Sequence, residues 1–486
     1  MALLPDITWF TEEARIAARA VGEFGASLLN PTVRLGVTGL SRAGKTVFIT
    51  ALLHNLIHGG RLPIFEAMAE GRIARARLEP QPDDDVPRFD YEAHVQALVD
   101  ERRWPESTRH ISELRLVIDY QSARGSTRER TLTLDIVDYP GEWLLDLPLL
   151  AKDYAQWSAE TLALSRSGAR AALAAPWHAY LAALDPSGAE DEQAAREAAR
   201  LFTAYLRACR DERFAMSLLP PGRFLMPGDL AGSPALTFAP LEVPADGTPP
   251  SGSLWAMMAR RFEAYKAVVV RPFFRDHFSR LDRQVVLVDA LSALNAGPEA
   301  MRDLESALGE ILACFRIGRG GLLSALVRPR IDRLLFAATK ADHLHHSSHD
   351  RLEQVLARMT ERAIARAKFS GALIDVIALA AVRATREAMV DWKGERLPAI
   401  IGTPLAGEAI AGQVFDGHTE TAAFPGDLPE DPSLPFNGGG AGAPGADYRF
   451  LRFRPPSLAV EKGEAVTLPH IRLDRALQFL LGDRLR

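Results

Sequence analysis

Short continuous apolar runs recur in two separate parts of the chain, and most are followed by a longer amphipathic stretch. The runs lie at 33–37, 285–289, 334–338 and 374–379. The amphipathic stretches with helical spacing lie at 47–57, 298–315 and 351–368. Continuous apolar runs of this length are typical of parallel strands that are buried on both faces. The pattern therefore predicts an α/β fold, with a mostly parallel sheet and helices on both of its faces.

A different pattern, alternating polar and apolar residues, marks 111–120 and 131–137. The two stretches are separated by Arg124-Gly125-Ser126, which is turn chemistry, so they predict an antiparallel hairpin. Between 58 and 104 the chain is rich in proline and aspartate, and we expect exposed turns there, followed by a helix over 91–103.

The middle of the chain, 146–282, is rich in alanine, leucine and arginine, with its clearest helix over 190–210. A stretch rich in proline and glycine, 219–253, interrupts it. Apolar strand runs precede and follow this region, so we expect a mainly helical insertion. The α/β domain is then discontinuous and comprises 31–145 and 283–390.

The two ends of the chain differ from the α/β part. Residues 1–30 predict an amphipathic helix, which either docks on a membrane or partner or packs on its own globule. Residues 391–468 predict a β-rich module with a strand over 448–453 and a flexible loop near 437–445. Residues 469–486 predict a C-terminal helix.

Composition narrows the class of protein. The 486 residues are 47% hydrophobic, which supports sizeable cores in more than one domain. The formal net charge of -5 gives no indication of a basic surface, so no nucleic-acid partner is expected. Two cysteines, Cys209 and Cys314, are too few for a disulfide framework and fit a reducing compartment. With neither a signal peptide nor a spanning run, we expect a cytoplasmic protein.

The stretch after the first apolar run carries the clearest chemistry. It reads Gly39-Leu40-Ser41-Arg42-Ala43-Gly44-Lys45-Thr46, with Val47 opening the next helix. In a loop of this spacing, glycines let backbone N–H groups surround phosphates, the lysine reaches the β and γ phosphates, and the last hydroxyl ligates Mg²⁺. The alternative is a glycine turn whose hydroxyl caps a helix. The flanking strand and helix favour nucleotide binding.

Two later segments supply candidates for the metal and the γ-phosphate. Thr108 lies in the loop Trp104-Pro105-Glu106-Ser107-Thr108, where GTPases place a hydroxyl that senses both groups. Asp138-Tyr139-Pro140-Gly141 ends the second hairpin strand, so Asp138 is a candidate Mg²⁺ carboxylate and Gly141 a candidate γ-phosphate donor. Glu142 occupies the place where many GTPases carry a water-orienting glutamine, and it acts as a base or is inert.

The strand at 334–338 ends in Thr339-Lys340-Ala341-Asp342, a variant of a guanine-binding signature. The carboxylate of Asp342 is suited to accept hydrogen bonds from guanine N1 and N2, a donor pair that adenine lacks. Ala381 and Val382 follow the next strand, where a GTPase places the backbone that meets guanine O6. Four histidines follow closely: His343, His345, His346 and His349. They are either metal ligands or part of a solvated loop at the start of a helix.

Taken together, the motifs resemble those of the YcjX-like family of bacterial P-loop GTPases. The residues that carry the resemblance are 39–46, 104–108, 138–142, Thr339-Lys340-Ala341-Asp342-His343 and Leu480-Leu481-Gly482-Asp483. The last motif is the most family-specific, because nucleotide chemistry does not explain it. The resemblance implies a Ras-like nucleotide domain with inserted and appended modules, GTP binding, an association with envelope stress and an inner-membrane partner.

The leading hypothesis is a Mg²⁺-dependent GTPase that acts as a conformational switch. Lys45 and the loop amides stabilise phosphate charge, Thr46, Thr108 and Asp138 hold the metal, and Thr108 and Gly141 sense the γ-phosphate. Arg42 either stabilises the transition state or is simply solvated. Without an obvious orienting glutamine, turnover is expected to be slow. The alternatives are an ATP-using enzyme or phosphotransferase with the insertion as a lid, and a non-hydrolysing adaptor. The sequence leaves the oligomeric state open.

Overall fold

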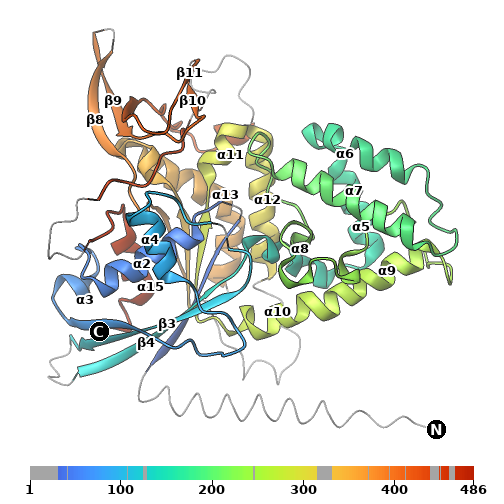
Figure 1. Cartoon of the computed structure of the whole chain (residues 1–486), viewed down its shortest axis with the longest axis horizontal. Helices are drawn as coiled ribbons and strands as arrows, with labels where there is room; N and C mark the ends of the chain where they lie inside the picture. The colour runs from blue at the N-terminus through green and yellow to red at the C-terminus, as the bar shows by residue number, and fades with distance from the viewer. Residues whose placement is uncertain are drawn as a thin grey trace.

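The computed structural model describes residues 31–486 apart from 41, 107, 124–128, 245–246, 315–330, 370–371, 393, 411, 438–447, 449 and 459–465. The expected N-terminal helix and nearly all of the expected loop at 437–445 lie outside these residues. Figure 1 shows three parts: a lobe built on a sheet, a helical lobe beside it, and a small group of strands above the sheet lobe.

Within the described residues, the main sheet has seven strands in the order β2-β3-β4-β1-β5-β6-β7. Their bounds are β1 Thr32–Gly39, β2 Ile73–Glu79, β3 Ser112–Gln121, β4 Glu129–Asp138, β5 Arg283–Val288, β6 Arg333–Ala338 and β7 Leu373–Ala378. Strands β4, β1, β5, β6 and β7 are parallel, whereas β2 and β3 are antiparallel to their neighbours. This arrangement confirms the expected α/β class and the hairpin.

Strand β2 is the main element that the sequence did not predict. The stretch 58–104 was expected to hold only turns and a helix, but Ile73–Glu79 pairs with β3 at the edge of the sheet. Most of its side chains are exposed or half-buried, so the strand lacks a continuous apolar run. The stretch also holds α3 Glu66–Ala69 and the expected helix, α4 Tyr91–Val99, which ends earlier than predicted.

Alternate strand residues point to two separate cores, one on each face of the sheet. Val33, Leu35 and Val37 of β1 pack with α2 (Lys45–Ile57) and α15 (Leu473–Leu481). Val286 and Val288 of β5 face the other way and belong to the core that holds the helices on that side. These helices are α11 Ala290–Ala296, α12 Pro298–Cys314 and α13 His349–Phe369.

The region 146–282 is mainly helical and forms the second lobe in Figure 1. The helix η1, Gly141–Ala151, leads into it, and it contains α5 Tyr154–Ser165, α6 Gly168–Leu181, α7 Glu192–Arg210, α8 Gly222–Leu225, η2 Gly228–Leu230, η3 Pro234–Leu236, α9 Leu254–Tyr265, η4 Lys266–Val270, α10 Arg271–Asp276 and η5 Phe278–Arg280. Trp157 lies at its centre, stacked on Phe262 with ring centroids 4.9 Å apart. Such an aromatic core stabilises the lobe beyond simple area burial.

The C-terminal β-rich region has a small antiparallel sheet in the order β12-β9-β8 and a two-stranded sheet of β10 and β11. Their bounds are β8 Arg386–Trp392, β9 Glu395–Gly402, β10 Ala409–Ile410, β11 Gln413–Val414 and β12 Thr421–Ala423; the short helix α14, Leu434–Asn437, follows.

The strand predicted over 448–453 is wrong: the described residues there form no strand, apart from a single bridge between Phe453 and Pro404. The Asn295 side chain satisfies both backbone groups of Phe450, at 3.0 and 3.1 Å, so no neighbouring strand is needed.

The C-terminal helix fastens to the ends of two central strands opposite to the ends that carry the nucleotide motifs. Arg283 begins β5 and is fully buried, and its guanidinium donates to both carboxylate oxygens of Asp483 at 2.7 Å and to the carbonyl of Leu480. The motif 480–483 therefore has a structural role in this fold. Among the described residues, no helix is both long and apolar enough to cross a lipid bilayer.

Candidate functional site

The loop between β1 and α2 has the backbone shape that a phosphate site needs. Gly44 caps α2 with φ of 80°, a left-handed conformation that side chains rarely adopt. The N–H of Ala43 donates to the carbonyl of Leu40 at 3.2 Å, which closes a tight turn before the helix. A helix N-terminus approached by such a turn presents N–H groups to an anion. Ser41 lies outside the described residues.

Lys45 and Gly141 meet at the start of this loop. The Lys45 ammonium donates to the carbonyl of Gly39 at 3.0 Å. A Cβ atom on Gly141 would lie only 1.7 Å from the same carbonyl oxygen. Only a glycine at position 141 therefore lets the backbone come this close to the loop. The structure therefore brings together two residues that the sequence placed at the γ-phosphate.

Thr46, Thr108 and Asp138, the three predicted metal ligands, also converge. The hydroxyl oxygens of Thr46 and Thr108 are 3.2 Å apart, and Thr108 donates to Asp138 Oδ2 at 2.6 Å. Asp138 Oδ1 is buried and has no hydrogen-bond partner among the residues that the structure describes. Oxygen ligands of this kind suit Mg²⁺, and a cation would satisfy the unpartnered oxygen. The residues present thus fit a magnesium ion.

The electrostatics of Asp138 agree with this fit. Burial raises the pKa of its carboxyl to about 6, although the Lys45 charge and the Thr108 hydrogen bond both favour the ionised form. A carboxylate that is buried without a full set of partners prefers to be protonated, and a divalent cation reverses that preference.

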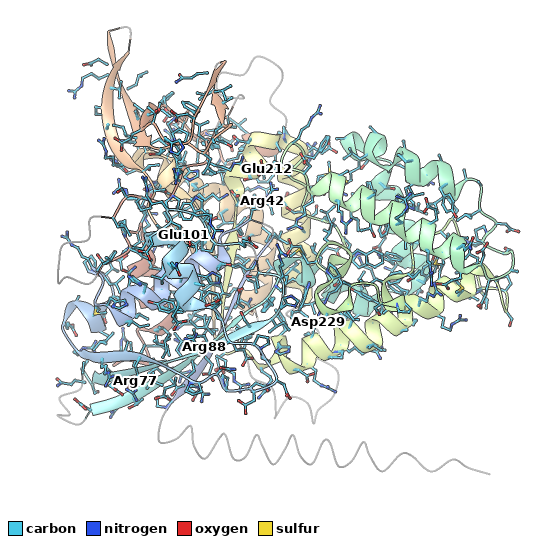
Figure 2. All side chains as sticks on the ribbon, in the orientation of Figure 1. Arg42, Arg77, Arg88, Glu101, Glu212 and Asp229 are labelled. Atoms are coloured by element: carbon cyan, nitrogen blue, oxygen red, sulfur yellow. The ribbon has the colours of Figure 1, made fainter. Side chains whose placement is uncertain are left out.

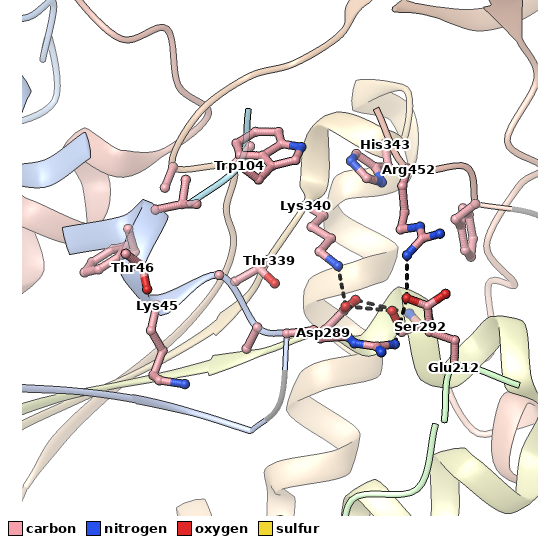
Figure 3. Close-up of a pocket in the computed structure, with 18 of the residues that line it drawn as sticks. Lys45, Thr46, Trp104, Glu212, Asp289, Ser292, Thr339, Lys340, His343 and Arg452 are labelled. Carbon is pink, nitrogen blue, oxygen red and sulfur yellow. Dashed lines mark hydrogen bonds and ion pairs between the residues drawn. The ribbon is translucent and has the colours of Figure 1, made fainter. Parts of the chain in front are cut away.

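The motif Thr339-Lys340-Ala341-Asp342 follows β6 and leads into η6, Ala341–His343. Lys340 has a left-handed backbone, with φ of 62°, and its ammonium pairs with Asp289 at the end of β5 (Figure 3). Burial opposes ionisation of Asp289, but Lys340 and Ser292 outweigh it and hold its pKa below the ordinary value.

Asp342 is joined to the loop that follows β7. Its Oδ2 accepts from the N–H of Ala384 at 2.8 Å, and its carbonyl accepts from the Thr385 hydroxyl. Ala380 in turn exchanges backbone hydrogen bonds with Ile471 at 3.1 and 2.8 Å. The predicted guanine-binding motif at 339–342 and the loop after β7, which was predicted to meet guanine O6, are therefore bonded to each other and to the segment before α15.

One cavity of about 480 Å³ extends from the phosphate loop after β1 to the predicted guanine-binding motif at 339–342 (Figure 3). This volume is within the range of small-molecule sites. The predicted residues that line it are Arg42, Ala43, Gly44, Lys45, Thr46, Val47, Thr108, Thr339, Lys340, Asp342, Ala381 and Val382. The other predicted residues that the structure describes are buried and do not line the cavity; they are Gly39, Leu40, Asp138, Gly141 and Glu142.

Several cavity residues were not predicted as site residues. Trp104 lines the wall and its indole N–H donates to the carbonyl of Phe453 at 2.6 Å, which ties the loop before β3 to the C-terminal region. Trp104, Pro105 and Glu106 had a sequence signal as parts of the motif at 104–108, and His343 had one as part of the motif at 339–343. Other lining residues come from the insertion and the C-terminal region, among them Arg210, Glu212, Phe450 and Arg452.

Arg42 points to the helical insertion. Its guanidinium lies 2.7 Å from Glu212, a carboxylate that also pairs with Arg452 (Figures 2 and 3). Glu142 is likewise engaged by the insertion, since Arg210 at the end of α7 lies 2.7 Å from its carboxylate. Both residues whose catalytic role the sequence left open are therefore paired with side chains of the insertion.

The four histidines after the base motif do not converge on one point. His343 is buried with its ring edge-on to Phe453, and His349, which begins α13, shares a hydrogen bond with the carbonyl of Ala341. Within the described chain, one group with metal-ligand spacing forms nearby: ligand atoms of His345, His346 and Glu387 lie within 4.8 Å of one another. The His346 side chain, in η7 (His346–Ser348), is 67% exposed and lies 2.7 Å from Glu387 of β8, so the two form an ion pair at the surface when His346 is protonated.

Comparison with known proteins agrees with the motifs and the cavity. A model of the YcjX-like family, DUF463, matches residues 33–485. A protein named Ras-like GTPase YcjX from Escherichia coli (strain K12) is 40% identical over 472 residues, which cover 93% of this chain and 96% of the relative. A protein of the same name from Shewanella oneidensis (strain MR-1) is 36% identical over 501 residues, with coverages of 97% and 99%. The chain therefore belongs to the YcjX-like family.

Proposed function

We propose that this protein is a Mg²⁺-dependent guanine-nucleotide-binding protein that hydrolyses GTP slowly and acts as a conformational switch. The observation that carries the proposal is the single cavity that joins the phosphate loop at Gly44–Thr46 to the carboxylate of Asp342. The name Ras-like GTPase, borne by two relatives, supports the same activity.

Each end of the cavity has its own task in this proposal. Lys45 and the loop N–H groups neutralise the β and γ phosphates, while Asp342 accepts from guanine N1 and N2. Mg²⁺, held by Thr46, Thr108 and Asp138, supplies charge neutralisation at the phosphates. Because Thr108 and Gly141 both lie at this end, loss of the γ-phosphate removes contacts from two segments at once.

Slow turnover follows from the surroundings of Glu142. A glutamate has no amide with which to orient water as a glutamine does, and the Glu142 carboxylate is already paired with Arg210 at 2.7 Å. We expect purified protein to turn over GTP far more slowly than once per second. Steady-state turnover of several GTP per second without a partner contradicts this part of the proposal.

Calorimetric titration tests the nucleotide specificity and separates GTP from ATP. We expect GTP and GDP to bind with Mg²⁺ present, to bind more weakly with EDTA, and to bind more tightly than ATP. Lys45→Ala should abolish GTP binding, whereas Lys152→Ala, which removes an ammonium outside the cavity wall, should leave it unchanged. Equal affinity for ATP and GTP favours the ATP-using enzyme instead. GTP binding without any single-turnover hydrolysis favours the adaptor.

The cellular role is a further part of the proposal. Family membership leads us to place the switch in the envelope stress response, as a cytoplasmic protein that meets a partner at the inner membrane. Affinity capture from cells with the protein held in the GTP-analogue or GDP state tests this role. A membrane protein captured in only one of the two states supports it, and identical captures in both states contradict it.

A further inference from the structure

The segment that follows Gly141 is fastened to the helical insertion along its length. Glu142 and Trp143 are 5% and 3% exposed, and the Trp143 indole N–H donates to the carbonyl of Met226 at 2.9 Å. The guanidinium carbon of Arg223 lies 3.1 Å from the centre of a Trp143 ring. A desolvated cation on the face of a tryptophan is a strong contact of its kind.

Asp146 extends this attachment by one more turn. Its two carboxylate oxygens accept from the N–H of Gly222 and the hydroxyl of Tyr265, each at 2.7 Å. A Cβ atom on Gly222 would lie 1.8 Å from the carbonyl oxygen of Glu142, so the two backbones are in direct contact. Any movement of the segment after Gly141 must therefore carry the start of α8 with it.

Arg210 is the cation that this attachment holds at the phosphate end of the cavity. It ends α7, it lines the cavity, and it lies 2.7 Å from Glu142, whose side chain is 7% exposed. Glu142 follows Gly141, and Gly141 approaches the Gly39 carbonyl that accepts from Lys45. A chain of direct contacts therefore links the Lys45 ammonium to the Arg210 guanidinium, through Gly39, Gly141 and Glu142.

The charges at this point require a cation once a triphosphate is bound. A γ-phosphate beside Gly141 lies near the Glu142 carboxylate, and two anions in a partly buried site repel each other. The planar guanidinium of Arg210 has enough donors to bind both oxygen groups. Glu212, a carboxylate of the insertion that also lines the cavity, is already bound by Arg42 and Arg452.

We propose that Arg210, supplied by the helical insertion, is a catalytic residue of GTP hydrolysis. In the transition state its guanidinium moves from the Glu142 carboxylate to the γ-phosphate oxygens. The inference rests on the proposed GTPase function. In the reaction, a bond forms between the water oxygen and the γ-phosphorus. The bond to the β–γ bridging oxygen breaks, and its electron pair stays on GDP. Both water hydrogens end on inorganic phosphate, which releases one to solvent near neutral pH. Arg210 neutralises the charge that builds on the γ-phosphate oxygens.

The test compares Arg210→Ala and Arg210→Lys with Arg207→Ala, a control that removes an exposed arginine from the same helix. In single-turnover assays we expect Arg210→Ala to lower the hydrolysis rate about 1,000-fold, as loss of an inserted arginine does. Arg210→Lys should restore little, because an ammonium lacks the planar fork. Affinity for GDP should match the wild type in all three variants, which shows that they are folded.

A second readout is binding of GDP with aluminium fluoride and Mg²⁺, which imitates the transition state. We expect the wild type and Arg207→Ala to bind this complex more tightly than GDP alone, and Arg210→Ala to lose the gain. If Arg210→Ala hydrolyses GTP and binds the fluoride complex like the wild type, the inference is overturned while the GTPase proposal stands. If the wild type binds no guanine nucleotide at all, the proposed function itself fails, and the inference with it.

Discussion

Gly141→Ala tests the contact on which the geometry of the phosphate end depends. The added Cβ would lie 1.7 Å from the Gly39 carbonyl oxygen and 3.2 Å from the Leu40 nitrogen. To reach an ordinary contact of 3.4 Å, the two segments must separate by about 1.7 Å, and both approached atoms belong to backbone. The Gly39 carbonyl also accepts from Lys45, so the separation displaces the phosphate loop itself.

Misplacement of a catalytic group by about 1 Å costs roughly 100-fold in rate, so we expect at least that loss of GTP hydrolysis in Gly141→Ala. The assay is single-turnover hydrolysis, with GDP affinity measured in parallel. Gly309→Ala is the matched control, because its Cβ points into open space within α12. It should leave turnover unchanged and stabilise the protein by about 0.5–1 kcal/mol. Wild-type turnover in Gly141→Ala would refute the close approach.

Two more predictions concern buried charges. Arg283→Met removes the bidentate partner of Asp483, which keeps the more distant Arg333 and Arg484. We expect a loss of about 1.5–3 kcal/mol in the free energy of unfolding, measured with urea; an unchanged urea midpoint would contradict the role given to the C-terminal motif. Burial raises the pKa of Asp138 to about 6, so the folded state binds its proton more tightly than the unfolded chain does. Without Mg²⁺, stability should therefore fall as the pH rises from about 4 to 6. The affinity for Mg²⁺ in the GDP complex should fall as the pH drops through 6, and Asp138→Asn should lose this component of the pH dependence. Equal pH profiles for both proteins would show that Asp138 does not titrate in this range.

The central strands and the nucleotide motifs could be predicted because their signals are local. A strand such as β6 is buried on both faces and reads as one apolar run, and the phosphate loop needs its glycines and lysine at fixed offsets. Strand β2 gave no such signal. It lies at the sheet edge, where Arg77 pairs with Asp119 of β3, so charged residues replace apolar ones.

The rest of the candidate site could not be predicted because it depends on tertiary contacts. Arg210 and Arg452 come from separate parts of the chain, and nothing in their local sequence distinguishes them from other surface arginines. They reach the cavity because the insertion and the C-terminal region fold over it. Likewise, Phe450 lies in a stretch with strand-like alternation, but the distant side chain of Asn295 satisfies its backbone.

The most direct test of the central claim is the relative affinity for GTP and XTP in the wild type and in Asp342→Asn. Xanthine carries a carbonyl where guanine carries its 2-amino group, so a carboxylate suits guanine and an amide, which both donates and accepts, suits xanthine. If Asp342 reads the base, the wild type prefers GTP and Asp342→Asn prefers XTP. If the substitution leaves the ratio of the two affinities unchanged, Asp342 does not contact the base and the cavity does not bind guanine as described.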